Sequence, residues 1–171
     1  LSVGWHGIGK ELFAREEREL TAYVVPGGIL VDFASLLKPE LAPLKLDGDP
    51  QHAGFHFRAD GEVADKTSRL THYIRPDGIG KRGETRNWPG QKDHVDLPWN
   101  AMSFVLGDDR YTVAMLDRPD NPKEARFSER DYGRFGSYFV RSLEAGQTLL
   151  VRYRLWLQQG AMTVENVASR S

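Results

Sequence analysis

The chain has 171 residues, of which 40% are hydrophobic and 27% charged, and it contains no cysteine. This composition is typical of one soluble globular domain, and the missing cysteines exclude disulfides, zinc–thiolate sites and thiol catalysis. The formal net charge of -1 argues against a nucleic-acid partner, and no apolar run approaches the roughly 20 residues of a transmembrane helix, so neither nucleic acid nor a membrane is expected as a partner.

Short alternating segments separated by turn residues dominate the chain. This pattern predicts an all-β fold, an antiparallel β-sandwich that residues 1–171 form as a single domain. Residues 11–20, ELFAREEREL, have a helical composition, but their neighbours are strands, so a strand is predicted there. Residues 20–25 stop at Pro-Gly-Gly and residues 29–37 follow, which indicates a hairpin.

Residues 52–60, HAGFHFRAD, form the most informative predicted strand. Because side chains alternate across a strand, His52, His56, Arg58 and Asp60 share one face, and small apolar side chains share the other. The polar face is either a solvated surface or a concave site. One metal ion is not expected to take both histidines, because the backbone rise between them is roughly 13 Å. We therefore predict no metal and no cofactor.

Residues 76–101 carry closely spaced prolines and glycines, which predicts a long ordered loop. Within it, NWPGQKDHVDLPWN offers Trp88, His94, Asp96 and Trp99. Tryptophans beside charged residues are typical of sugar sites, where aromatic faces stack on the ring and charged groups hold the hydroxyls. The alternative is that both tryptophans anchor the loop onto the sandwich.

A second hairpin is predicted where residues 102–106 and 110–116 flank Gly-Asp-Asp. Residues 148–158, TLLVRYRLWLQ, predict a long central strand, and residues 162–170 predict a short C-terminal helix.

Residues 117–139, DRPDNPKEARFSERDYGRFGSYF, are interpreted as a long connection with five aromatics and many charges. Surface ion pairs contribute only about 0–1 kcal/mol, so stability alone is a weak reason for so many charges. We predict an ordered functional loop. In it Tyr132 packs inward, Gly133 turns the chain, and Arg130 and Asp131 point into the same cleft as His56.

Three segments together resemble a known family: FHFRADGEV, NWPGQKDHVDLPW leading into YTVAMLDRPDNP, and SERDYGRFGSYF followed by LEAGQTLLVRYRLWLQQG. They are similar to the soluble bacterial family labelled PmoA-like, or methane-oxygenase-like, whose function is unknown. The likeness covers roughly residues 10–165. It implies a mutarotase-like sandwich (a supersandwich), an association with polysaccharide degradation and an extracytoplasmic location.

Two departures from that family pattern stand out. The family's upstream strands with an H-H-R-G motif have no match, so the chain is expected to lack upstream strands of the domain. In addition, Ser128 and Glu129 stand where the family has a histidine before R-D-Y-G.

These patterns predict a carbohydrate-active protein, an enzyme that acts on a sugar or glycoside by His/carboxylate acid–base chemistry, with hydrolase, lyase and epimerase left open. The alternatives are a non-catalytic carbohydrate-binding module and a structural subunit completed by another chain. The expected partner is a small-molecule or oligosaccharide ligand, and an oligomer is left open. The predicted catalytic residues are His56, His94, Asp96 and Asp117. The predicted substrate-binding residues are His52, Arg58, Trp88, Trp99, Arg130, Asp131 and Tyr132.

Overall fold

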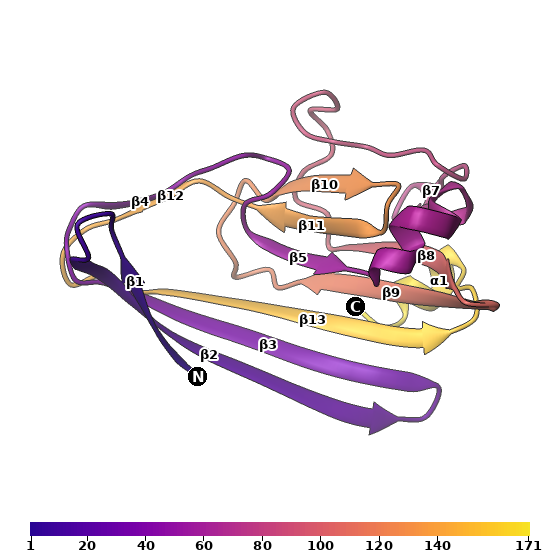
Figure 1. Ribbon diagram of the computed structural model, residues 1–171, viewed down its shortest axis with the longest axis horizontal. Helices are drawn as coiled ribbons and strands as arrows, with labels where there is room; N and C mark the ends of the chain where they lie inside the picture. The colour runs from indigo at the N-terminus through magenta and orange to yellow at the C-terminus, as the bar shows by residue number, and fades with distance from the viewer.

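The computed structural model describes residues 1–171, and most of the chain forms antiparallel strands (Figure 1). The large sheet has eight strands in the order β1-β2-β3-β13-β9-β8-β6-β7. Their bounds are β1 (Ser2–His6), β2 (Leu12–Val25), β3 (Gly28–Pro39), β6 (His72–Arg75), β7 (Gly78–Ile79), β8 (Trp99–Leu106), β9 (Asp109–Asp117) and β13 (Leu149–Gln159).

Two smaller sheets and three short helices complete the fold. The small sheet has the order β10-β11-β5, and a two-stranded sheet joins β12 to β4. Their bounds are β10 (Arg126–Arg130), β11 (Arg134–Tyr138), β5 (Phe55–Arg58), β12 (Arg141–Leu143) and β4 (Leu44–Leu46). The helices are the π-helix η1 (Val63–Thr67), the 3-10 helix η2 (Ser68–Leu70) and α1 (Val164–Ala168). All are too short to cross a lipid bilayer.

The small sheet packs against one face of the large sheet, which confirms the predicted β-sandwich (Figure 1). Phe127 and Phe135 of the small sheet are fully buried against Met102 and Met115 of the large one. The opposite face of the large sheet carries a second cluster, in which Trp99 is packed with residues around α1. The middle of the large sheet is therefore covered on both faces.

The predicted hairpins and the C-terminal helix are confirmed. β2 pairs with β3 through a turn at Pro-Gly-Gly, and β8 pairs with β9 through a turn at Gly107. The predicted strand at residues 11–20 lies within β2 except for Glu11, and β13 is central because it pairs with both β3 and β9. α1 begins after Thr163, whose side chain accepts a hydrogen bond from the backbone N–H of Asn166 in a capping box.

The interpretation of residues 117–139 as a long connection is wrong. Most of this stretch is the β10–β11 hairpin, in which Phe127 pairs with Ser137 and Glu129 with Phe135. Because residues that face each other across an antiparallel pair share one face of the sheet, these side chains all point at the large sheet. Phe127 and Phe135 are buried because they pack between the two sheets, and not because they fasten a loop.

The predicted strand over residues 52–60 is shorter than expected, because β5 covers only Phe55–Arg58. Gly54 has a φ of +90°, and a Cβ there would lie 2.1 Å from the carbonyl oxygen of Ser137. This close approach requires glycine and ends the strand on its N-terminal side. His52 therefore lies outside the strand, exposed and 3.2 Å from Asp49.

Candidate functional site

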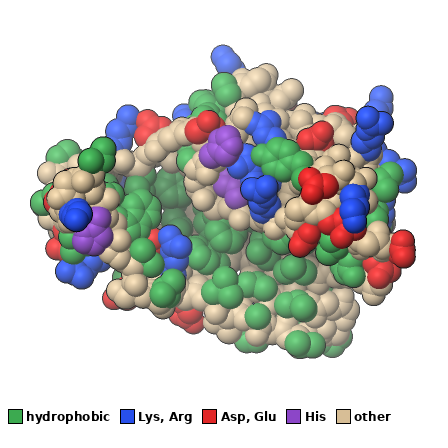
Figure 2. Space-filling model, viewed as in Figure 1, with side chains coloured by type: hydrophobic (Ala, Val, Ile, Leu, Met, Phe, Trp, Pro, Cys, Tyr) green, Lys and Arg blue, Asp and Glu red, His purple; other side chains and the backbone are tan.

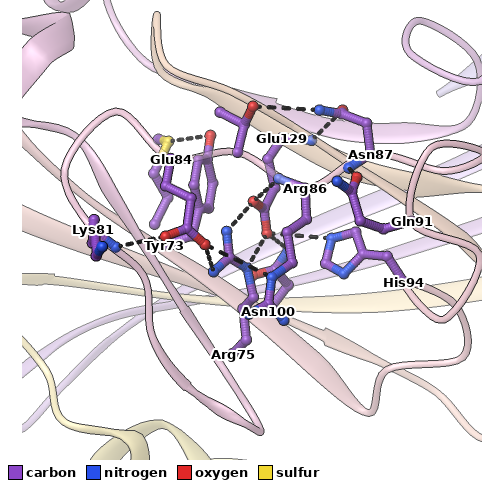
Figure 3. Close-up of polar contacts among 12 residues, drawn as sticks. Tyr73, Arg75, Lys81, Glu84, Arg86, Asn87, Gln91, His94, Asn100 and Glu129 are labelled. Carbon is purple, nitrogen blue, oxygen red and sulfur yellow. Dashed lines mark hydrogen bonds and ion pairs between the residues drawn. The ribbon is translucent and has the colours of Figure 1, made fainter.

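A fully buried carboxylate lies where the two sheets of the sandwich meet (Figure 3). Glu129 extends from β10 toward the large sheet, and its carboxylate accepts hydrogen bonds from Arg75 of β6 and Asn100 of β8. The backbone N–H of Arg86 in the 80–98 loop donates a further bond, at 2.7 Å. A carboxylate offers about four acceptor positions. These donors therefore hold Glu129 in one orientation.

Arg75 is the main partner of Glu129 and is itself 1% exposed. Its Nε lies 2.9 Å from Oε1 and its Nη2 lies 2.6 Å from Oε2, which is the two-point geometry that suits a guanidinium and a carboxylate. Gly80 lets the loop pass close by, because a Cβ there would lie 2.6 Å from Nη1 of Arg75. Burial raises the pKa of Glu129, but the hydrogen bonds from Arg75 and the close contact with His94 outweigh it and hold that pKa below its ordinary value.

His94 completes the cluster from the loop (Figure 3). It is 3% exposed, and its Nε2 lies 3.3 Å from Oε1 of Glu129. This contact is not a well-aligned hydrogen bond, and Nε2 has no other partner. A carboxylate favours the tautomer that carries a proton on the nitrogen facing it. Nδ1, which points away from Glu129, makes no hydrogen bond within the chain.

A small polar cavity of about 210 Å³ opens beside this cluster. Pockets for drug-sized ligands measure about 300–1,000 Å³, so this cavity suits a small ligand or one unit of a longer one. It offers donors and acceptors together, which fits a ligand rich in hydroxyl groups. It is lined by Arg75, Pro76, Asp77, Arg86, Asp93, His94 and Leu97.

Tyr73 ties the β10–β11 turn to the large sheet beside the cluster. Its hydroxyl accepts a hydrogen bond from the backbone N–H of Arg130, at 3.1 Å, and lies 2.7 Å and 2.9 Å from the carbonyl oxygens of Arg130 and Arg134. Burial raises the pKa of Tyr73 well above its ordinary value, so the hydroxyl stays protonated. Gly133 has a φ of +87°, as the predicted turn requires.

Replacing Tyr73 with phenylalanine is expected to lower the free energy of unfolding by about 1–3 kcal/mol, because buried backbone groups of the turn lose their partner. Urea unfolding measures the change. Tyr132→Phe is the matched control, because the Tyr132 hydroxyl makes no hydrogen bond within the chain. Equal losses in the two variants would show that the Tyr73 hydroxyl does not hold the turn.

The predicted site residues on the small sheet share its outer face, away from Glu129. His56, Arg58 and Arg130 lie on this face, and the Tyr132 ring lies beside Arg58 rather than packing inward as predicted. Asp131 is exposed, and no hydrogen bond joins it to His56 or Arg58. Arg130 therefore lies on the same face as His56 and Arg58, whereas the exposed Asp131 makes no contact with either of them.

Trp88 and Trp99, which were predicted to stack on a sugar, pack against other side chains of the protein. Trp99 is 3% exposed in the core next to α1. The guanidinium of Arg126 lies over the Trp88 ring, 3.9 Å from its centre. The expectation that these rings stack on a sugar is not supported by this geometry, and the anchoring alternative fits it.

Asp96 and Asp117 hold backbone in place. Asp96 has a φ of +51° and accepts a hydrogen bond from the N–H of Ala125. Asp117 accepts hydrogen bonds from Asn121 at 2.6 Å and from Lys123 at 2.9 Å, which fastens the turn after β9. The predicted site residues thus fall in separate places, and only His94 lies in the buried cluster.

Arg75, Asn100 and Glu129 were not predicted as site residues. The alternation of side chains along a strand could have indicated two of them, because Arg75 shares a strand face with Tyr73 and Glu129 shares one with Phe127. A charged residue two positions from an aromatic core residue in a strand points inward with it. No three His, Asp or Glu side chains come close enough to ligate a metal ion.

A family model described as "Family of unknown function (DUF6807)" matches residues 2–171. No curated protein matches the chain. No solved structure matches it either, so the mutarotase-like subtype of the sandwich stays a prediction.

Proposed function

Because the chain belongs to the DUF6807 family, whose function is unknown, we propose its function from the cavity itself: a carbohydrate-active enzyme in which His94 transfers a proton. One observation carries the proposal. His94 is buried beside a polar cavity, with one ring nitrogen held by a buried carboxylate and the other unbonded.

The chemistry follows from the two ring nitrogens. With Nε2 protonated toward Glu129, Nδ1 carries the lone pair and accepts a proton from a ligand hydroxyl or from an acidic C–H. The ring then becomes positively charged, and the ionised carboxylate of Glu129 stabilises it. Glu129 acts through His94 and is a positioning residue.

Arg75 supplies positive charge at the same cavity. Negative charge that develops on a ligand oxygen as the proton leaves is stabilised by such a fixed donor in a site with little water. Asp77 and Asp93 also line the cavity and are the carboxylates on which a hydrolase reaction would depend. Lyase and epimerase reactions need only the base and the stabilising charge.

We also propose that the protein resembles the soluble bacterial PmoA-like family in its function. This likeness implies a role in polysaccharide degradation and an extracytoplasmic location. The cavity lends support, because its mixture of cationic, anionic and imidazole groups suits a polyhydroxylated ligand.

The test is a turnover screen. The protein is incubated with a panel of oligosaccharides and uronides, and new reducing ends and the absorbance of unsaturated uronides are followed while binding is measured in parallel. We expect release of product from at least one sugar class, and the readout that responds separates hydrolysis from elimination. Saturable binding without any turnover, lost in Trp88→Ala, would instead support a carbohydrate-binding module.

A further inference from the structure

Three arginines lie side by side on the outer face of the small sheet. Arg130 of β10 pairs with Arg134 of β11, and Arg134 pairs with Arg58 of β5. Paired residues share a face, and neighbouring strands are about 4.8 Å apart, so the three side chains start within about 10 Å of one another. Figure 2 shows histidine and Lys/Arg side chains gathered over this part of the molecule. We call these three residues the arginine row.

No carboxylate neutralises the arginine row. None of its members forms an ion pair or a side-chain hydrogen bond within the chain. Nε and Nη2 of Arg134 are buried without a partner. Arg130 contributes weakly to the lowered pKa of Asp49, which the N–H of Gln51 and the side chain of His52 mainly cause.

Such an arrangement is unfavourable without a ligand. Like charges directly opposite on neighbouring strands destabilise a sheet, and buried unpaired donors cost free energy. The Tyr132 ring offsets part of this cost, because its centre lies 5.9 Å from the Arg58 guanidinium and 5.7 Å from that of Arg134. An aromatic ring does not use the N–H donors, so those of the exposed Arg58 and the half-buried Arg130 stay available to an oxyanion.

Beside the arginine row, the same face of the small sheet carries neutral polar side chains. Ser128, Gly136 and His56 lie in register there, and Oγ of Ser128 and Nδ1 of His56 are buried without partners. Burial, followed by Arg134, lowers the pKa of His56, so its ring is neutral. Since Nε2 contacts the carbonyl oxygen of Ala53 at 2.7 Å, Nδ1 is a buried acceptor and adds no positive charge to this face.

We propose that this face binds an acidic sugar through its carboxylate or sulfate group, which the arginine row holds. The anion neutralises the unpaired guanidinium groups. The site shares no residue with the His94 cavity, so it stands whether or not His94 is catalytic.

The test is calorimetric titration of the protein with galacturonate, with sulfated galactose and with uncharged galactose. The first two probes distinguish carboxylate from sulfate. We expect saturable binding of at least one acidic sugar and at least tenfold weaker binding of galactose. Arg134→Gln, and separately the exposed Arg58→Gln, are expected to weaken acidic-sugar binding by about 10- to 100-fold, the loss of one or two charge-assisted hydrogen bonds.

Arg141→Gln is the matched control, because Arg141 is an exposed strand arginine outside the row. It is expected to bind like the native protein. Equal weakening in Arg141→Gln, equal affinity for galactose, or no saturable binding of either acidic sugar would overturn the proposal, as would tighter binding of a single-stranded oligonucleotide. Loss of turnover in the oligosaccharide screen would bear on His94 alone.

Discussion

Replacing Glu129 with glutamine is expected to lower the free energy of unfolding by about 3–5 kcal/mol at neutral pH. The change removes the negative charge that neutralises Arg75. The Arg75 side chain is 1% exposed, and no other carboxylate lies as close to it. Its second carboxylate, Glu84, lies 3.4 Å away and is 39% exposed, so water screens it. A buried guanidinium is then left without a full counter-charge.

Urea unfolding at several pH values measures this effect. The pKa of Glu129 is lower in the folded protein than in the unfolded chain. Its ionisation therefore stabilises the fold at pH values above the ordinary pKa of about 4.3. This contribution is lost as the pH falls through the folded-state pKa. The difference between native protein and Glu129→Gln is therefore expected to be complete near neutral pH and to shrink in acid below about pH 4.

Glu124→Gln is the control for this experiment. Glu124 also pairs with an arginine, Arg126 at 2.8 Å, but its side chain is 45% exposed. Exposed pairs contribute about 0–1 kcal/mol, so this variant should unfold almost like the native protein. Similar decreases in the free energy of unfolding in Glu124→Gln and Glu129→Gln would mean that the buried Arg75–Glu129 pair stabilises the fold no more than an exposed pair does.

Replacing His94 with glutamine is expected to reduce kcat/KM by about 10²- to 10⁴-fold on the sugar that the turnover screen identifies, the range that a positioned acid or base contributes. Glutamine keeps a donor that can reach Glu129 but offers no basic nitrogen. Steady-state kinetics measure the loss, and urea unfolding of the same variant shows whether the fold is retained.

His72→Gln is the matched control for the kinetic experiment, because His72 is half-buried and lies outside the cavity. Full activity in His72→Gln with the loss confined to His94→Gln supports the assignment. A folded His94→Gln variant with native kcat/KM would refute it and leave the buried cluster a structural one. Glu129→Gln, as a positioning change, should alter the pH dependence of kcat rather than abolish binding.

The architecture could be predicted because its signals are local. Alternation at residues 20–25 and 29–37, with Pro-Gly-Gly between them, is enough to indicate a hairpin, and the same holds around Gly107. The β10–β11 hairpin was missed because charges interrupt its apolar alternation. Glu129 is the charge that interrupts the inward-facing side chains, whereas Arg130 and Arg134 stand opposite each other on the outer face.

The candidate site could be predicted only in part. His94 stands out in a loop rich in tryptophan and charge, which is a local signal. The Arg75–Glu129 pair spans 54 positions of the sequence and joins strands of two different sheets. Alternation can indicate that each side chain points inward, but only the packing of one sheet on the other shows that they meet.

The most direct test is a long-range ¹H–¹⁵N correlation spectrum of the histidine side chains, recorded in alkaline solution. The chain has five histidines, and the signal missing from His94→Gln assigns the ring in question. The account predicts a neutral His94 with its proton on Nε2, facing Glu129, and a bare Nδ1. A ring with its proton on Nδ1 would contradict it, because the nitrogen that points away from Glu129 could then not accept a proton.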